Sequence, residues 1–326
     1  MGDAVVKDMF YELRDFVPGL DVLVKLEGLN PAGSIKVKSA AAMIRRLAEQ
    51  GVLRPGSHIV ESTSGNLGVA LAAVAAAEGY QVTLVTDPNA SSHNVRAMRA
   101  LGAEVVVVTR RDANDGFLGS RIDYILGMLA AEPDLLWLNQ YANRAPVVAH
   151  RDGTAEEILA EVGPPDWLFV GAGTTGTLMG VVERFAQFRN RTTVVGVDAV
   201  GSVTFGGAPA RRRVPGLGTS RVPEIFDPTA EFTRVQVSES DTIRTCRRVA
   251  REHGLLLGGS SGTVLAAVHL LRDRIAPGAR VVAISPDMGD HYLDTIYDDE
   301  WVTGYFGPEA VDIGQPLSGK GVLNLV

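Results

Sequence analysis

Apolar runs typical of β-strands alternate with segments of helical periodicity along most of this chain, and this alternation limits its fold more than any other feature. In the first part of the sequence, the strand-like runs 21–27, 58–62, 80–86 and 103–109 each lead into a helix-like segment. Further strand-like runs occupy residues 135–140, 166–173, 192–199 and 280–286. Strands that are apolar almost throughout are typical of a parallel sheet covered by helices on both faces. The sequence therefore predicts an α/β fold, in which ligands bind beyond the carboxyl ends of the strands.

Composition narrows the class of protein. The chain has 326 residues, 46% of them hydrophobic, which allows a large core and suggests about two domains. The net charge of −7 argues against general nucleic-acid binding. No run approaches the ~18 apolar residues of a membrane span, and the first ten residues lack the pattern of a signal peptide. We therefore expect a cytoplasmic protein with no membrane partner.

Cysteine and histidine usage gives little indication of metal or redox chemistry. The single cysteine, Cys246, lies in the helix-like segment 242–254 and is expected to be buried. One cysteine cannot form an intrachain disulfide or a thiolate metal cluster. None of the six histidines has the H-E-x-x-H spacing of a zinc site, so we expect no metal ligands.

A lysine stands where a turn leads into a helix, in the stretch Asn30–Lys38 (NPAGSIKVK). Ser34 is expected to cap this helix. Counting at helical spacing places Lys36 on the apolar side of the helix and Lys38 on the polar side. The helix dipole and burial would both lower the pKa of Lys36, which suits a nucleophilic or Schiff-base amine. A lysine whose stem covers apolar surface while its amine stays in water is the structural alternative.

Two more loops between a strand and a helix have polar side chains that could bind an anion. In Glu61–Gly68 (ESTSGNLG), polar side chains and helix N-terminal amides would form an anion site that fits the carboxylate of an amino acid. In Gly258–Ala267 (GGSSGTVLAA), Ser260 or Ser261 would cap the following helix or donate to a ligand. An ordinary polar cap is the alternative in both loops.

The loop Gly171–Gly180 (GAGTTGTLMG) has two interpretations. Gly171, Gly173 and Gly176 match G-x-G-x-x-G, and Asp198 ends the next strand where a ribose-binding acid belongs, so the loop fits a dinucleotide. The loop also fits a phosphate monoester, because threonine hydroxyls add donors to the helix N-terminus. The glycine pattern alone does not decide between these ligands.

The segment Gly201–Pro228 is long, rich in glycine and proline, and without periodicity. Such segments within compact domains are typical of lids and binding loops, and a disordered surface excursion is the alternative. The segment contains Arg211–Arg213, which would form either an anion site or a solvated basic loop.

The motifs KLEGLNPAGSIK, ESTSGNLGVALA, LNQYANRA, GAGTTGTLMG and GGSSG resemble, in order and spacing, the cysteine synthase family of fold-type II pyridoxal 5'-phosphate (PLP) enzymes. The resemblance extends from about Asp21 to about Asp290 and implies a two-domain α/β fold of the tryptophan synthase β type, with a mostly parallel sheet in each domain. A smaller domain, residues 30–140, would carry the substrate-carboxylate loop. A larger domain, residues 1–29 and 141–326, would carry the phosphate cup and the lid.

The resemblance also implies a role for each matching residue. Lys36 is implied to be the catalytic lysine that holds PLP as a Schiff base, and Ser260 the partner of the pyridine nitrogen. The implied phosphate cup comprises Gly173, Thr174, Thr175, Gly176 and Thr177. The implied contacts to substrate are Thr63, Ser64, Gly65, Asn66, Gln140, Tyr141 and Gly216, with Asn66 also near the cofactor.

The chemistry implied by the resemblance is β-replacement. The substrate amine would displace Lys36, and the freed amine would remove the Cα proton. PLP would act as the electron sink. A neutral serine at the ring nitrogen, in place of an aspartate, would favour rapid loss of the β-leaving group. The resulting α-aminoacrylate would then accept a nucleophile at Cβ.

Departures from the common family pattern indicate a subgroup. Val37-Lys38 follows the lysine where Asp-Arg is common, and Thr175 replaces a glycine of the cup. The segment 197–226 resembles the synthases that join O-phospho-L-serine to L-glutamate. Their product, N-(2-amino-2-carboxyethyl)-L-glutamate, is the precursor of 2,3-diaminopropionate in siderophore and antibiotic biosynthesis. The basic residues near the lid would then bind the phosphate or the carboxylates of these substrates; they are Arg211, Arg212 and Arg213.

Three other functions remain open from the residues alone. They are a cysteine synthase that uses sulfide, an NAD-dependent dehydrogenase that uses the segment 171–198, and a non-catalytic protein with the PLP-enzyme fold. The resemblance further implies a homodimer acting on small amino-acid substrates.

Overall fold

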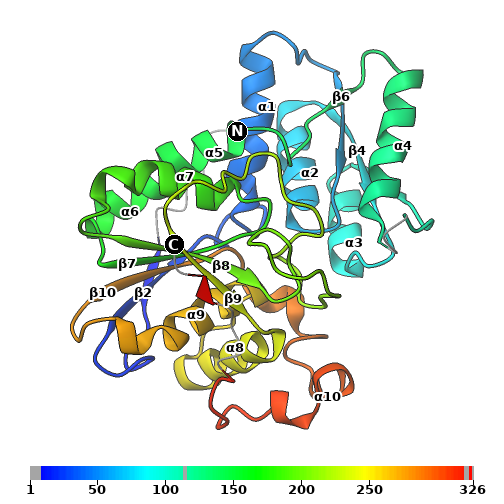
Figure 1. Cartoon of the computed structure of the whole chain (residues 1–326). Coiled ribbons are helices and arrows are strands. Elements are labelled where there is room, and N and C mark those ends of the chain that lie inside the picture. The colour runs from blue at the N-terminus through cyan, green and yellow to red at the C-terminus, as the bar shows by residue number, and fades with distance from the viewer. Residues whose placement is uncertain (1–8, 113–115, 319–322, 325–326) are drawn as a thin grey trace. The chain divides into compact units, whose positions relative to one another are not determined.

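The chain divides into two compact units. The computed structural model describes residues 9–112, 116–318 and 323–324. The smaller unit contains Asn30–Pro146, and the larger contains the described parts of Val6–Leu29 and Val147–Val326. Each unit is an α/β structure built on a sheet of its own (Figure 1).

The sheet of the larger unit has seven strands in the order β1-β2-β10-β7-β8-β9-β11. The five central strands run parallel, and β1 and β11 pair antiparallel at the two edges. The bounds of the strands are β1 Phe10–Glu12, β2 Asp21–Leu26, β7 Trp167–Gly171, β8 Thr193–Ala199, β9 Thr233–Val237, β10 Arg280–Ser285 and β11 Leu323–Asn324.

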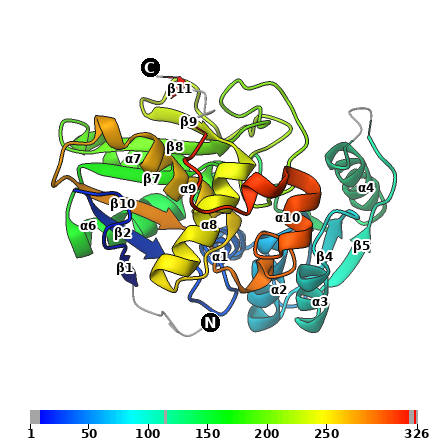
Figure 2. The same ribbon diagram turned by 90° about the horizontal axis from the view of Figure 1, so that it is seen from below.

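Helices cover both faces of this sheet. Helices α8 (Glu239–His253) and α9 (Gly259–Leu270) lie on one face, with α9 packed directly on the central strands (Figure 2). On the other face, α5 (Ala145–Ala149) continues through the π-helical turn η1 (His150–Thr154) into α6 (Ala155–Val162), beside α7 (Gly176–Phe185). The remaining helical elements are α10 Asp299–Phe306 and the short 3-10 turns η2 Ala186–Phe188, η3 Arg272–Arg274, η4 Asp290–Tyr292 and η5 Pro308–Ala310.

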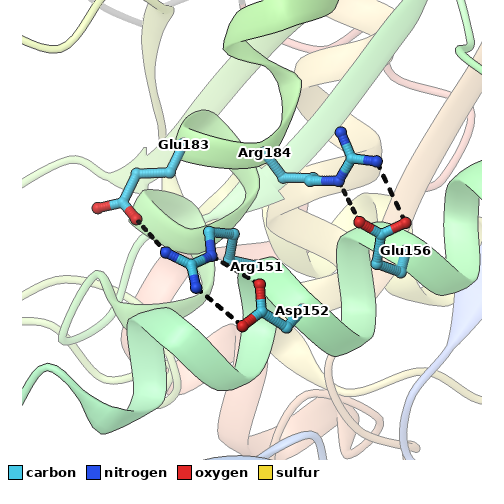
Figure 3. Close-up of polar contacts among 5 residues, drawn as sticks. All are labelled: Arg151, Asp152, Glu156, Glu183 and Arg184. Atoms are coloured by element: carbon cyan, nitrogen blue, oxygen red, sulfur yellow. Dashed lines mark hydrogen bonds and ion pairs between the residues drawn. The ribbon is translucent and has the colours of Figure 1, made fainter.

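Helix α7 packs unusually close to the π-helical turn. A Cβ on Gly180 would lie 2.4 Å from the carbonyl oxygen of Val147 and 2.7 Å from the amide of Arg151, so only glycine fits there. On the surface of the same helices, Arg151 pairs with Asp152 and Glu183, and Arg184 pairs with Glu156 (Figure 3). Exposed pairs of this kind contribute little individually. The close packing therefore fixes the position of α7, whose first two residues, Gly176 and Thr177, belong to the predicted phosphate cup.

The smaller unit has a four-stranded, fully parallel sheet in the order β5-β4-β3-β6. Helices α2 and α3 pack on one face, with α1 against α2, and α4 packs on the other face (Figure 1). The bounds are α1 Lys36–Glu49, β3 His58–Ser62, α2 Asn66–Glu78, β4 Gln81–Thr86, α3 Ser92–Ala100, β5 Glu104–Val107, α4 Leu118–Ala131 and β6 Leu136–Trp137.

The predicted α/β class, with mostly parallel sheets covered by helices, is confirmed. The segment Gly201–Pro228 contains no helix or strand, as predicted, but it is packed rather than a loose excursion. The rings of Phe205 and Phe226 contact each other and the ring of Phe232, and all three are buried. Cys246 is fully buried, and burial raises the pKa of its thiol to about 12, so the thiol is unreactive near neutral pH. Within the described residues, no helix has the length and apolar character needed to cross a membrane.

Candidate active site

Lys36 is the first residue of α1, in the smaller unit. The predicted cap is wrong by one position: Ile35 is the N-cap residue, and the Ser34 hydroxyl instead accepts a hydrogen bond from the Lys36 amide at 3.4 Å. The predicted apolar face is confirmed, since Ala40, Met43 and Ile44 are buried. Lys36 is half-buried at the positive end of the helix, where a charged amine is disfavoured. Lys38 is also half-buried, so it faces water less than the helical count indicated.

The loop Thr63–Asn66 joins β3 to α2 in the smaller unit. Gly65 is the N-cap residue of α2 in an extended conformation, and no side chain caps the helix. The Gly68 amide donates to the Gly65 carbonyl at 2.9 Å, and the positive end of the α2 dipole lies at this loop, where an anion is favoured. Thr63 is buried and its hydroxyl accepts from the Gly65 amide at 3.4 Å, whereas Ser64 and Asn66 are half-buried.

Gln140 is held against the same loop by a buried glutamate that sequence reasoning missed. The Gln140 side-chain amide donates to the carbonyl of Ser62 at 2.9 Å, and its backbone amide donates to Glu61 at 3.1 Å. Glu61 is fully buried and also accepts from the Ser62 amide and from the indole of Trp137. Burial raises the pKa of Glu61 to about 7, although these hydrogen bonds oppose the rise. A carboxylate directly after the apolar residues Ile59 and Val60 of β3 was the signal that could have identified it. Tyr141, the next residue, is half-buried.

In the larger unit, the loop from Gly171 to Thr175 joins β7 to α7. Thr175 is the N-cap residue of α7 with a φ of 68°, a left-handed conformation that is a rare outlier for a β-branched residue. Thr175 is 2% exposed, and its buried Oγ1 has no hydrogen-bond partner within the described residues. Such an orphaned group at a helix N-terminus is typical of a place where a ligand oxygen belongs. The neighbouring hydroxyls of Thr174 and Thr177 are half-buried.

The segment around Gly216 lies over this loop. The Gly218 amide donates to the carbonyl of Ala172 at 2.9 Å, and a Cβ on Gly173 would lie 3.0 Å from the Gly216 carbonyl oxygen. Gly216 has a φ of +110°, and a Cβ there would lie 3.1 Å from the Cβ of Ser260. The structure thus brings together three sequence-predicted features of the larger unit: the threonine loop, the lid glycine and Ser260.

Ser260 lies in the first turn of α9 and does not cap it, since Gly258 is the N-cap residue. The Ser260 hydroxyl donates to the Asp287 carboxylate at 3.2 Å, and the other oxygen of that carboxylate accepts from the Tyr292 hydroxyl. Ser260 and Asp287 are both buried. Sequence reasoning missed Asp287, although its place just past the carboxyl end of β10 was a signal.

The three arginines near the lid differ in their surroundings. Arg212 donates to the carbonyls of Gly201 and Ala210, and burial lowers the pKa of its guanidinium. Arg213 lies 3.7 Å from the centroid of the Tyr305 ring. Arg211 is exposed. Two of the three arginines therefore have structural contacts that fix the segment.

Asp198, the predicted ribose ligand of the dinucleotide interpretation, is fully buried at the end of β8. One carboxylate oxygen accepts from the Ala199 amide, and burial raises the pKa of the carboxyl to about 6. A carboxyl without solvent exposure cannot bind a ribose unless the chain rearranges, so the structure disfavours the NAD interpretation.

Sequence comparison identifies the family. Residues 11–287 match the family described as pyridoxal-phosphate dependent enzymes, so the chain belongs to this family of PLP enzymes. The chain is 42% identical over 283 residues to the N-(2-amino-2-carboxyethyl)-L-glutamate synthase of Ralstonia nicotianae, which covers 86% of this chain and 84% of that protein.

Solved structures agree with the family. An O-ureido-L-serine synthase superposes with a TM-score of 0.82 and 31% identity, covering 91% of this chain and 96% of that one. An O-acetylserine-dependent cystathionine β-synthase from Helicobacter pylori superposes with a TM-score of 0.83 and 28% identity, covering 91% and 97%. The resemblance to cysteine synthase-like PLP enzymes is thereby confirmed.

PLP is the cofactor of this family, and the larger unit has features that fit its phosphate. The Thr175 hydroxyl has no partner within the described residues, and the amides at the N-terminus of α7 lie beside it. Together with the glycines of the loop, which allow close approach, these donors suit a phosphate group. Lys36 in the smaller unit supplies a half-buried amine.

Proposed function

We propose that this enzyme replaces the phosphate of O-phospho-L-serine with the amine of L-glutamate, giving N-(2-amino-2-carboxyethyl)-L-glutamate. The observation that carries the proposal is the 42% identity to a synthase of that name over 86% of the chain. PLP supplies the electron sink for loss of the β-substituent. The product would serve 2,3-diaminopropionate formation in siderophore or antibiotic biosynthesis.

Residue roles follow from the motifs and the local geometry. Lys36 would hold the cofactor covalently and, once released, take the Cα proton of the substrate. The loop Gly173–Thr177 would bind the cofactor phosphate through backbone amides and threonine hydroxyls. The loop Thr63–Asn66 would bind the substrate carboxylate together with Gln140, which Glu61 and Ser62 orient.

Ser260 would contact the pyridine nitrogen. Its single hydroxyl proton is directed at Asp287 in this structure. If the Ser260 hydroxyl donates to an unprotonated ring nitrogen, it must give up its hydrogen bond to Asp287. Gly216 and Tyr141 would lie near the substrate. Arg211, which is exposed, is the arginine whose charge is most available for the phosphate or carboxylate groups of the substrates.

Competition between nucleophiles tests the proposed reaction. The purified enzyme is incubated with O-phospho-L-serine and an equimolar pool of L-glutamate, other amino acids and sulfide, and the products are identified by mass spectrometry. The glutamate adduct should dominate. Faster formation of cysteine, from O-phospho-L-serine or O-acetyl-L-serine, would instead identify a cysteine synthase. The O-acetylserine-dependent structural relative is the reason for testing O-acetyl-L-serine as well.

A lysine variant tests the cofactor attachment. Lys36→Ala should abolish both turnover and the covalent cofactor adduct that borohydride reduction fixes in the wild type. Lys38→Ala, two residues further on, is the matched control and should retain the adduct. An adduct that persists in Lys36→Ala would refute the assignment.

Assembly, location and domain roles are further parts of the proposal. We propose a cytoplasmic homodimer, on the basis of the family resemblance. The domain of residues 30–140 would provide the carboxylate loop, and residues 1–29 and 141–326 would provide the phosphate cup and lid. The two compact units support this division, because each has a sheet and a hydrophobic core of its own.

A further inference from the structure

Asp287 is held tightly against the start of α9, within the larger unit. Strand β10 packs beside this helix (Figure 2), and Asp287 stands two residues past the end of the strand. A Cβ on Gly258 would lie 1.9 Å from Oδ1 of Asp287, so only glycine allows the carboxylate so close. The Asp287 carbonyl accepts from the Gly258 amide at 3.1 Å and from the Ser261 hydroxyl at 3.3 Å. Both the backbone and the side chain of Asp287 are therefore fixed beside the first turn of α9.

Both carboxylate oxygens of Asp287 accept hydrogen bonds from hydroxyl groups. Oδ1 accepts from Ser260 at 3.2 Å, and Oδ2 accepts from Tyr292. Asp287 is 4% exposed and Ser260 is 3% exposed. Accepting at both oxygens is the behaviour of an ionised carboxylate, and the positive end of the α9 dipole favours its charge. In this arrangement the hydroxyl proton of Ser260 is directed at Asp287.

A pyridine nitrogen placed at Ser260 would leave too few protons for the hydrogen bonds. The chain from Asp287 through Ser260 to the nitrogen has two hydrogen bonds, and each of them needs a proton. An ionised carboxylate and an unprotonated pyridine nitrogen only accept, so the Ser260 hydroxyl is the single donor between them. Either one of the two hydrogen bonds is lost, or a second proton enters the chain.

The surroundings of Ser260 and Asp287 oppose the loss of their hydrogen bond. Gly216 covers the serine, since a Cβ on this glycine would lie 3.4 Å from Oγ of Ser260. The contacts with Gly258 keep Asp287 from moving away. A buried carboxylate oxygen that loses its donor retains the full cost of its desolvation, and burial favours the neutral form of a carboxyl. Uptake of a second proton is therefore favoured over a lost hydrogen bond.

Two titratable neighbours of Asp287 keep their own protons. Burial raises the pKa of the Cys246 thiol to about 12, and the charge of Asp287 adds to this rise. Burial is also the main cause that raises the pKa of the Tyr297 hydroxyl. Arg247, a cation that acts on Cys246, is paired with Asp299. Because the thiol and the phenol stay protonated near neutral pH, the second proton would come from solvent.

We propose that Asp287 is a positioning residue for the cofactor, which fixes the Ser260 hydroxyl and takes up one proton from solvent, together with Ser260 and the pyridine nitrogen, when PLP binds. If the carboxyl holds this proton, Asp287 donates to Ser260 and Ser260 donates to the nitrogen. If the nitrogen holds it, both hydrogen bonds run in the opposite direction, and the number of protons is the same. The inference rests on the proposed contact between Ser260 and the pyridine nitrogen, and not on the identity of the substrates.

Proton uptake on cofactor binding tests this inference. The full-length enzyme, freed of PLP, is titrated with PLP by calorimetry in buffers of different ionisation enthalpy, without substrates. Asp287→Asn is the decisive variant, because its amide can donate to Ser260 without an added proton while its oxygen still accepts from Tyr292. The wild type should take up about one proton more per cofactor than this variant. Proton changes at Lys36 occur in both enzymes and cancel in the difference.

The pH dependence of PLP affinity gives a second readout. Because the complex would hold one proton more than the free enzyme, binding should weaken as the pH rises. The affinity of the wild type should fall up to about tenfold more per pH unit than the affinity of Asp287→Asn. A purely structural role for Asp287 would change the stability of the enzyme but would leave this slope and the proton count unchanged.

Two further variants complete the test. Ser260→Ala removes the middle of the chain and should also lower the uptake by about one proton, so it keeps the test decisive if Asp287→Asn does not fold. Asp294→Asn, which changes an exposed carboxyl of the same segment, is the matched control and should show the wild-type uptake.

Equal proton uptake by the wild type and Asp287→Asn would overturn the proposal. Wild-type uptake in Ser260→Ala would overturn it as well. If Asp287→Asn lowers the uptake in that case, the failure lies in the proposed contact between Ser260 and the nitrogen. Failure of the proposed β-replacement reaction would leave all these results unaffected, since no substrate is present.

Discussion

Thr175 combines two unfavourable features that have one explanation. Its left-handed backbone stores strain of about 1–3 kcal/mol, and its buried hydroxyl has no partner within the described residues. A glycine would adopt this backbone without strain, but it would offer no hydroxyl. The residue therefore exchanges stability for a donor in the proposed phosphate cup.

Replacing Thr175 with glycine should separate these two effects. We expect Thr175→Gly to raise the thermal stability of the cofactor-free enzyme, because relief of the strain exceeds the glycine entropy penalty of about 0.5–1 kcal/mol. The same change should weaken PLP binding about tenfold through loss of a hydrogen bond to a charged phosphate. Calorimetry and cofactor titration measure the two quantities. Unchanged PLP affinity would show that the hydroxyl does not contact the phosphate.

Glu61 makes the stability of the smaller unit dependent on pH. Its pKa is about 7 in the folded chain against an ordinary value of 4.5, because burial disfavours the charged form. Between these values the unfolded chain has released the proton and the folded chain retains it, so folding stability falls as pH rises from 4.5 to 7. The loss amounts to about 3 kcal/mol.

A glutamine at position 61 should remove this pH dependence. We expect the difference in free energy of unfolding between wild type and Glu61→Gln to fall by about 3 kcal/mol from pH 4.5 to 7, and to stay constant above pH 7. Urea denaturation at a series of pH values measures it. Glu49→Gln, on the exposed face of α1, is the control and should give a constant difference. Parallel curves for wild type and Glu61→Gln would contradict the assignment.

For single residues, the sequence predicts whether a side chain is buried better than it predicts its hydrogen-bond partners. The helical count identified the buried face of α1 because the period of a helix is a local property. It could not identify the role of Glu61, since its partner Trp137 lies 76 residues away and reaches it only through strand pairing. The cap expected at Ser34 was wrong, and of the two interpretations left open for Ser260 and Ser261 the capping one is excluded, since Ile35 and Gly258 are the N-cap residues.

At the scale of elements, the lid segment lies with its backbone close to the start of α9 and to the loop before α7. Gly216 has a positive φ and lies against Ser260, and the adjoining Gly218 amide donates to the loop before α7. Glu239, in the first turn of α8, accepts from the amides of Arg213 and Val214 and so anchors the start of this approach. Sequence reasoning identified the segment from its glycines but could not identify this anchor.

A pair of glycine variants distinguishes the effect of the close contact between Gly216 and Ser260 from the effect of backbone strain. Gly216→Ala and Gly206→Ala both place a side chain at positive φ, but only the first meets Ser260, and the space around Gly206 is open. Both variants should lose about 1 kcal/mol of stability. Only Gly216→Ala should also shift the absorption spectrum of the bound cofactor and lower kcat. Equal effects of the two variants on the spectrum would exclude a specific role for Gly216.

The strands were predicted unevenly, for a physical reason. The bounds of β3 match the prediction, and β2, β4, β7, β8 and β10 match within one or two residues at most ends, because buried parallel strands are continuous apolar runs. Strand β9 was not predicted, since its sequence TRVQV alternates polar and apolar residues. The π-helical turn η1 has no signal in the sequence, because it arises from close packing against Gly180.

On the scale of the whole molecule, each unit has its own core, so each should respond to PLP removal mainly near its own proposed cofactor contacts, Lys36 in the smaller unit and the phosphate loop in the larger one. Removing PLP from the holoenzyme should destabilise the larger unit, because binding at about 100 times Kd contributes roughly 2.7 kcal/mol. Hydrogen exchange should quicken at the start of α7 and around Gly216. The amides of β4, in the core of the smaller unit, provide the internal control and should change less. Uniform quickening throughout the chain would contradict separate responses.

The order of strands in the larger sheet has a consequence for synthesis. Strand β2, second from one edge of the sheet, pairs with β10, which the ribosome makes about 260 residues later. At about 5–20 residues per second, β2 waits roughly 13–50 s for its neighbour. During this time Asn30–Pro146, the described part of the smaller unit, can already fold. An apolar strand without its partner is a site of aggregation, so chaperone supply should limit the yield of this enzyme more than its final stability does.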